Sequence, residues 1–265
     1  MKPPALLLHA SILASALLTA LPADAVGRLV DINVIDRDSG TRLPVYLHEG
    51  QWWIAGQPGA RYAVELRNAT GARVLGVLAI DGVNAISGET AAWTQAGYVL
   101  AHRQRARITG WRKSDAEVAA FHFTRLPHSY AARTGRPGHV GVIGVAVFHE
   151  REQPPPVASI TEAPRGTREA DGAPEATASA RREAPAAMPR LGTGHGEREA
   201  SRVTHTCFER RDARPDEIIT IRYDRRENLV ALGVIQATPD PAHPPAAFPQ
   251  SMAGHGYTPD PPAWR

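Results

Sequence analysis

The chain has 265 residues, and its 30 Lys and Arg against 27 Asp and Glu give a formal net charge of only +3. Acidic and basic residues alternate along the sequence, which argues against the strongly basic face that nucleic-acid binding requires. Cys207 is the single cysteine, so no internal disulfide can form and the fold must rest on its hydrophobic core.

Residues 1–25 carry the features of a secretory signal peptide. Lys2 supplies a basic start, an apolar run extends to Leu21, and Ala23-Asp24-Ala25 forms a small-x-small cleavage site. The mature chain is therefore expected to begin at Val26 and to be periplasmic or secreted. No later segment has the roughly 20 consecutive apolar residues that a membrane-spanning helix needs, so we expect no transmembrane segment after signal cleavage.

Residues 26–150 are predicted to form one domain of short β-strands. LPVYLHEG, QWWIAG, RYAVELRN and ARVLGVLAI are apolar runs bounded by turn residues. Asp81-Gly82 is a turn pair in which glycine accepts positive φ, so ARVLGVLAI and VNAIS are expected to pair as an antiparallel hairpin. GYVLAH and RARITGW are expected to form a second hairpin, and HVGVIGVAVFHE a long last strand.

Two segments of this domain predict short helices. In GWRKSDAEVAAFHFT, Ser114 and Glu117 have the spacing of a capping box, and Asp115 would lie in the first helical turn. SYAARTG reads as a further short helix that ends at Gly135.

The rest of the chain divides into three segments of different composition. Residues 151–190 are rich in Pro, Ala and alternating charge, which predicts a disordered linker because so few large apolar residues cannot offset the entropy of ordering. Residues 191–235 contain three strand-like runs, SRVTHTCFERR, DEIITIRYD and ENLVALGVI, expected to complete the sheet of the first domain. Residues 236–265 form a Pro-rich tail predicted to be disordered.

These elements indicate a mainly β protein, an antiparallel β-sandwich with one or two short helices. The pattern leaves open whether the strands follow a jelly-roll or an immunoglobulin-like order.

Several strings resemble a family of uncharacterised exported β-rich proteins of Gram-negative bacteria. The strings are GETAAWTQAGYVL, GWRKSDAEVAAFHFT, SYAARTGRPGHVGVIGVAVF, LGTGHGERE and IRYDRRENLVALGVI, and the resemblance covers most of residues 60–150 and 190–235. It implies a β-rich periplasmic or secreted protein, and it carries no activity over to any residue.

Trp93 is the leading candidate for a binding residue. It lies in the polar loop from Gly88 to Gly97 with Glu89, and no apolar periodicity predicts its burial. Exposed aromatic side chains stack on sugars or anchor protein partners, while the alternative is a tryptophan that folds back to cap the end of the sandwich. Trp52 and Trp53, adjacent in a strand, must point to opposite faces, so only one of them can enter the core.

A second candidate surface lies in HRQRARITGW. If the alternation of a strand holds, Arg103, Arg105 and Arg107 share one face. Such a ridge could meet an anionic glycan or an acidic protein, although charged faces are also the norm on antiparallel sheets.

A metal site is the alternative reading of the region after the linker. His195, His205 and Cys207 are ligands of the right types, and His205 and Cys207 would share a face in a strand. No two-plus-two ligand spacing completes the set. The three glycines of LGTGHGERE could present N–H groups to an anion, but no lysine or helix start completes a phosphate loop.

The sequence therefore predicts a non-catalytic binding module of the periplasm or cell envelope, without a cofactor, whose partner is an envelope protein or a glycan. Two alternatives remain open: a metal-dependent hydrolase that uses His195, His205 and Glu197, and a structural component of the envelope.

Overall fold

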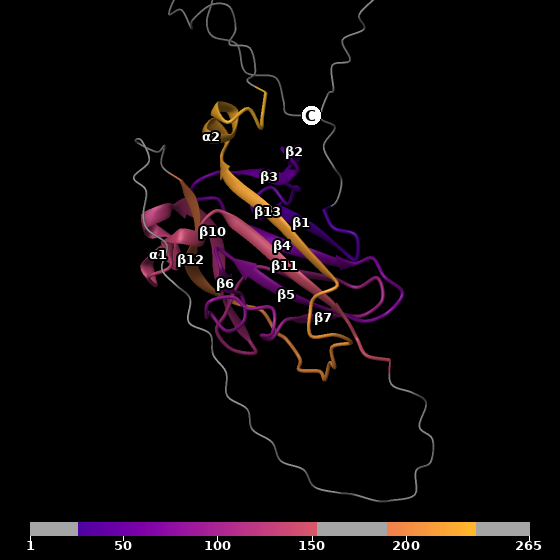
Figure 1. Ribbon diagram of the computed structural model, residues 1–265. Coiled ribbons are helices and arrows are strands. Elements are labelled where there is room, and N and C mark those ends of the chain that lie inside the picture. The colour runs from indigo at the N-terminus through magenta and orange to yellow at the C-terminus, as the bar shows by residue number, and fades with distance from the viewer. Residues whose placement is uncertain (1–25, 153–189, 237–265) are drawn as a thin grey trace, which may run out of the picture. The chain divides into compact units, whose positions relative to one another are not determined.

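The computed structural model describes residues 26–152 and 190–236, which form three β-sheets around one core (Figure 1). The predicted signal peptide, most of the predicted linker and the Pro-rich tail lie outside the described residues. The predicted class is confirmed, because the described chain is mainly β with a few short helices.

The largest sheet has seven strands. Its order is β2-β3-β13-β11-β5-β6, and β7 also pairs with β5. The strands are β2 (Val45–His48), β3 (Gln51–Gly56), β5 (Val74–Ile80), β6 (Val83–Asn84), β7 (Tyr98–Leu100), β11 (Val142–His149) and β13 (Glu217–Arg225). All pairs are antiparallel except β13 with β3, which is parallel. β13, from the end of the chain, thus lies between two strands that precede the linker.

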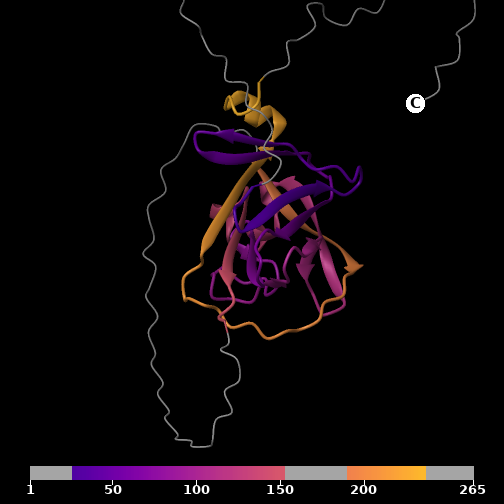
Figure 2. The ribbon, with the colours of Figure 1, turned by 90° about the vertical axis from the view of Figure 1, so that its right-hand side faces the viewer.

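Two three-stranded sheets lie opposite the large sheet. The order of the first is β1-β4-β8 and that of the second β12-β10-β9. Their strands are β1 (Val30–Asp36), β4 (Tyr62–Asn68), β8 (Arg105–Ile108), β9 (Gly110–Arg112), β10 (Glu117–Arg125) and β12 (Leu191–Ala200). The two sheets meet at Thr109, whose carbonyl accepts a hydrogen bond from the N–H of Phe121 (2.9 Å). Figure 2 shows β12 and β13 spreading apart toward the lower end of the molecule, while at the other end they are in contact, where the Leu191 N–H donates to the Asp224 carboxylate (3.2 Å).

The core between the sheets is built by the alternation of the strands. On β4, Tyr62, Val64 and Leu66 point inward and are fully buried. They meet an aromatic group in which the Tyr62 ring stacks on Phe123, with 4.3 Å between ring centroids. Buried aromatic pairs of this kind add about 0.5–1.5 kcal/mol beyond their area, so this group fastens β4 to β10.

The helices are short and lie at strand ends. They are α1 (Tyr130–Arg133), α2 (Arg226–Ala231) and two 3-10 turns, Leu126–His128 and Pro137–His139. The predicted helix in SYAARTG is α1, and the Ser129 hydroxyl caps it by accepting a hydrogen bond from Ala132 N–H (3.2 Å). Within the described ranges, no helix is long and apolar enough to cross a membrane.

The predicted helix at Ser114 is wrong, because the segment is the hairpin that joins β9 to β10. The Ser114 hydroxyl accepts a hydrogen bond from Ala116 N–H (3.2 Å), and the Glu117 carbonyl accepts from Lys113 N–H (3.0 Å). A serine followed by polar residues satisfies a tight turn as well as a helix cap, and the burial of the β10 side chains selected the turn.

Three other predicted elements are corrected. The second hairpin does not form, since β7 pairs with β5 and β8 with β4. ENLVALGVI begins with helix α2 instead of forming a strand. The strand expected at SRVTHTCFERR lies ten residues earlier, at Leu191–Ala200.

The glycines of β12 explain its unexpected place. A Cβ on Gly194 would lie 2.2 Å from the Nε2 atom of His122, and one on Gly192 would lie 2.6 Å from the Cβ of Ser129. These glycines therefore permit β12 to approach β10 and the turn before α1, and LGTGHGERE is a strand and not a phosphate loop.

Candidate functional site

Asp81 is the most deeply buried acidic residue among those that the structure describes. It follows β5 at the turn into β6, with φ of 52°, and Gly82 follows with φ of 70°, so the predicted Asp-Gly hairpin turn is present. Its side chain is fully buried. A buried carboxyl group is a common mark of a functional site, so its partners decide its role.

Four hydrogen-bond donors surround this carboxyl group. Oδ1 accepts from the N–H of Gly141 (2.8 Å), from the N–H of Val142 (3.3 Å) and from the hydroxyl of Tyr223 (2.6 Å). Oδ2 accepts from the N–H of Thr193 (2.8 Å). Residue 81 thereby joins the turn before β11 to β12 and β13.

The hydroxyl of Thr193 extends the network across the core. Its Oγ1 atom lies 2.6 Å from the Tyr62 hydroxyl and 2.7 Å from the Tyr223 hydroxyl. All four side chains of this group, which we call the Asp81 cluster (Tyr62, Asp81, Thr193, Tyr223), are at most 2 % exposed. No substrate can reach them, and every donor has a partner, so the cluster fastens the sheets together and is not an active site.

Burial raises the pKa of Asp81 above its ordinary value, and the four hydrogen bonds only partly oppose this rise. Between the unfolded and folded pKa values, the native state holds more protons than the unfolded state, so stability must fall as the pH rises through that window. We expect the difference in unfolding free energy between the wild type and Asp81→Asn to shrink as the pH rises from about 4. Urea titrations at several acidic pH values test this, and a difference that grows with pH would contradict it.

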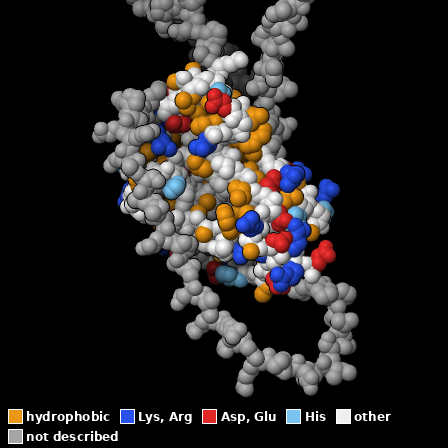
Figure 3. Space-filling model, viewed as in Figure 1, with side chains coloured by type: hydrophobic (Ala, Val, Ile, Leu, Met, Phe, Trp, Pro, Cys, Tyr) orange, Lys and Arg blue, Asp and Glu red, His pale blue; other side chains and the backbone are white. Residues whose placement is uncertain are grey.

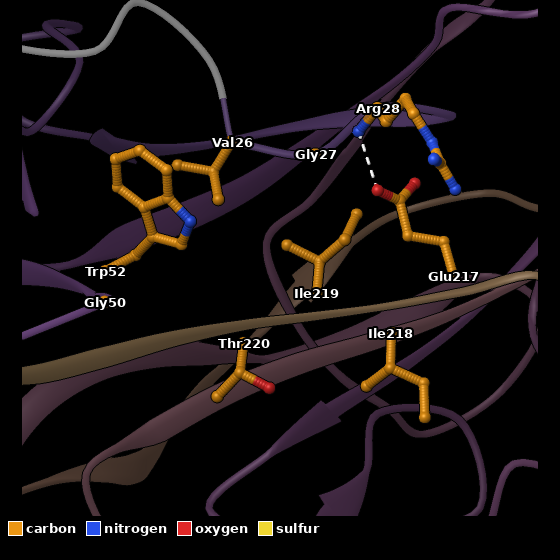
Figure 4. Close-up of a pocket in the computed structure, with 9 residues that line it drawn as sticks. All are labelled: Val26, Gly27, Arg28, Gly50, Trp52, Glu217, Ile218, Ile219 and Thr220. Atoms are coloured by element: carbon orange, nitrogen blue, oxygen red, sulfur yellow. Dashed lines mark hydrogen bonds between the residues drawn. The ribbon is translucent and has the colours of Figure 1, made fainter.

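A groove at one end of β13 is the candidate binding site. It encloses about 470 Å³, within the range of about 300–1,000 Å³ that ligand pockets occupy. We call it the β13 groove, and its lining is Val26, Gly27, Arg28, Gly50, Trp52, Glu217, Ile218, Ile219 and Thr220 (Figure 4).

The N-terminal wall of the groove is held in place by Glu217. Its carboxylate accepts hydrogen bonds from the N–H of Arg28 (2.8 Å) and of Leu29 (2.7 Å). Val26 is buried against the core, and its carbonyl accepts from Ile32 N–H (2.8 Å). The wall is therefore preformed.

The groove has a mixed polar and apolar lining and is open to solvent. Trp52 is partly buried at one end, and Ile218 is 59 % exposed, the largest exposed fraction among the large hydrophobic residues that the structure describes. Leu47 of β2 pairs with Trp52 and is also exposed. Figure 3 looks onto the face with β11 and β13 and shows hydrophobic side chains exposed between charged ones.

The predicted Trp93 loop is a separate surface. The Trp93 side chain is 49 % exposed, while the Arg210 guanidinium donates hydrogen bonds to the carbonyls of Trp93 (3.4 Å) and Gln95 (2.7 Å). The Gln95 amide also donates to the carboxylate of Glu89 (3.3 Å). The backbone of the loop is thus braced, and its tryptophan extends into solvent.

The predicted arginine ridge is only partly built. Arg105 and Arg107 share a face of β8, but Arg103 lies in the preceding turn with φ of 56°. Arg107 pairs with Glu65 of β4 (3.3 Å). In the described part of the chain, the arginines that contact the Trp93 loop are Arg136 and Arg210 instead.

The predicted metal ligands have other partners. His195 stacks on the Tyr130 ring at 5.5 Å, and burial, followed by the charge of Lys113, lowers its pKa. His205 pairs with Asp115 (2.9 Å), and Cys207 is exposed. Glu197 is an exposed residue of β12. Among residues 26–152 and 190–236, no three His, Cys, Asp or Glu side chains form a group that could hold a metal ion.

Sequence reasoning missed both the Asp81 cluster and the β13 groove. Asp81 was recognised only as a turn residue, because its partners are between 60 and 142 positions away. The paired tryptophans gave no signal for the groove either, because Trp52, which lines it, is the one that packs against the core, and Trp53 lies on the other face of β3 beside Arg222.

Comparison with known proteins finds no matching family model, no matching curated protein and no matching solved structure. The functional argument therefore rests on the geometry of the described residues. Within that geometry, the buried Asp81 cluster is structural, and the β13 groove and the Trp93 loop are two surfaces that expose large hydrophobic side chains.

Proposed function

We propose that this protein is a non-catalytic binding module of the periplasm or cell envelope, and that the β13 groove receives part of another protein. Support for this location comes from the predicted signal peptide and from the resemblance to exported proteins. The observation that carries the binding role is the combination in the groove of an exposed apolar residue, Ile218, with a fixed wall.

A protein partner fits this groove better than a glycan does. Interfaces between proteins bury aromatic and aliphatic anchors at their centre, surrounded by a polar rim. Here Val26 and Trp52 supply apolar surface on the inner face of β13, and Ile218 lies on its outer face beside Thr220, with the exposed Arg28 at the rim (Figure 4). Sugar binding would instead call for an aromatic face surrounded by polar side chains, which is closer to the setting of Trp93.

Selection of peptides from a displayed random nine-residue library against the full-length mature chain tests this proposal. We expect peptides whose affinity falls at least about tenfold in Trp52→Ala, because truncation of an aromatic anchor typically costs more than 1 kcal/mol. Trp93→Ala is the matched control and should bind them unchanged.

Trp52 also packs against the core, so Trp52→Leu provides a milder variant, and urea unfolding confirms that each variant folds. The proposal fails if no peptide is enriched, or if enriched peptides respond to Trp93→Ala and not to Trp52→Ala.

A further inference from the structure

The hydrogen-bond ladder between β13 and β3 stops before β13 does. β13 begins at Glu217, but its first pair with β3 is Ile221 with Trp52. β3 cannot extend further, because Glu49 (φ 49°) and Gly50 (φ 72°) form the turn that returns the chain to β2. Residues 217–220 therefore pair with β11 on one side only.

The direction of the unpaired backbone groups follows from the pairing with β11. Tyr223 N–H donates to the Gly141 carbonyl (2.9 Å), so residue 223 faces β11. Backbone groups alternate along a strand, so Ile219 also faces β11, and the N–H and C=O of Ile218 face the groove. Within residues 26–152 and 190–236, no strand or loop pairs with Ile218 on that side.

The residues that line the groove lie on both faces of this open edge (Figure 4). Figure 4 shows the side chain of Ile219 pointing toward Gly27, and the side chains of Ile218 and Thr220 pointing the opposite way. An added strand would continue the line of β3, with Gly50 and Trp52 at one end. Its alternate side chains would meet Val26 and Trp52 on the inner face and Ile218 and Thr220 on the outer face.

We propose that the partner binds by strand addition, as an extended segment that pairs with the open edge of β13 at Ile218. This inference rests on the proposed function and names the form that its partner takes. Backbone hydrogen bonds supply affinity in such complexes, and pockets for alternate side chains supply specificity. The edge spans four residues, roughly 13 Å at the usual rise of a strand, so the segment carries apolar residues at alternate positions over four or five residues.

The unpaired edge selects an extended segment over other occupants. A helix satisfies its own backbone groups and would leave the N–H and C=O of Ile218 without partners. A second copy of this chain would have to place its own β13 edge here, but residues 26–28 and the β2-β3 hairpin flank that edge on both molecules. A single free segment meets no such obstacle.

Ile218→Pro tests the backbone pairing directly. Proline removes an N–H that β11 does not use, and it is tolerated where that group faces away from the ladder. We expect the selected peptides to bind Ile218→Pro at least tenfold more weakly than the wild type. Ile218→Val, the matched control, shortens the side chain but keeps the N–H, and should bind within about twofold. A selected peptide can be N-methylated on either of its two sets of alternate residues. Methylation of the set whose N–H groups face β13 should abolish binding, and methylation of the other set should not.

The outcomes separate this inference from the proposed function. Strand addition is overturned if peptides that need Trp52 bind Ile218→Pro as well as they bind the wild type, and if they also keep their affinity when N-methylated in either register. The groove would then remain a binding site. No enriched peptide at all would overturn both. A dimer in light scattering that Ile218→Pro abolishes would assign the edge to a second copy of this chain and overturn the foreign segment. If Ile218→Pro unfolds at a lower urea concentration than the wild type, its binding result is set aside. Binding of the N-methylated peptides to the wild type then tests strand addition.

Discussion

Asp81→Ala is expected to lower the free energy of unfolding by about 3–5 kcal/mol. The change removes the acceptor of four hydrogen bonds and leaves the donors of Gly141, Thr193 and Tyr223 buried without it. A buried donor that loses its partner costs about 1–3 kcal/mol, and partial rearrangement toward the remaining Thr193 and Tyr223 oxygens reduces the sum. Urea unfolding followed by far-UV circular dichroism measures the loss.

Asp38→Ala is the matched control for this prediction. Asp38 also follows a strand closely and pairs with Arg61 (2.9 Å), but that pair lies at the surface. Exposed ion pairs contribute little to stability, so the urea midpoint should not change. Equal midpoints for Asp81→Ala and the wild type would show that the Asp81 cluster does not fasten the sheets.

The Asp81 cluster connects stability to the proposed binding site. Tyr223 and Ile218 lie on the same strand, and the cluster holds β13 in register between β3 and β11. The open edge at Ile218 exists only in that register. Asp81→Ala should therefore weaken peptide binding only as far as it unfolds the chain, whereas Ile218→Pro acts on binding in a folded chain.

The strand pattern before the linker could be predicted because it is local. Asp81-Gly82 specifies its own turn, and runs such as ARVLGVLAI carry enough aliphatic residues to identify a buried strand. The pairing of these strands could not be predicted, because β7 and β8 are neighbours in the sequence but join opposite sheets. That choice depends on contacts made far along the chain.

The region after the linker was predicted less well for a related reason. β12 contains Gly192, Gly194 and Gly196, which have low strand propensity. The approach of β10 makes glycine necessary there, and that approach is a tertiary contact. Helix α2 has only six residues, and Leu229 is its one buried hydrophobic residue. So short a pattern does not distinguish a helix from a strand.

Gly110→Ala is the second substitution with a large expected effect. A Cβ on Gly110 would lie 2.1 Å from the carbonyl oxygen of Ala119 and 2.6 Å from its carbonyl carbon. Both are backbone atoms of β10, so no side chain can rotate away, and the strands must separate. Forced separation in a packed core costs about 1–3 kcal/mol, and the loss of ladder hydrogen bonds adds to it. We expect a destabilisation of about 2–4 kcal/mol.

The position of Gly110 explains why the effect should be large. It lies directly after Thr109, where the chain leaves the sheet of β4 and joins that of β10, and Trp111 follows with its ring edge-on to Phe121 at 5.1 Å. Near-UV circular dichroism should report the disturbed packing of Trp111, and urea unfolding the loss of stability. Gly71→Ala is the matched control, since an added Cβ there has no atom within 4 Å. If both variants unfold at the wild-type midpoint, the close approach of β9 and β10 is not needed for the fold.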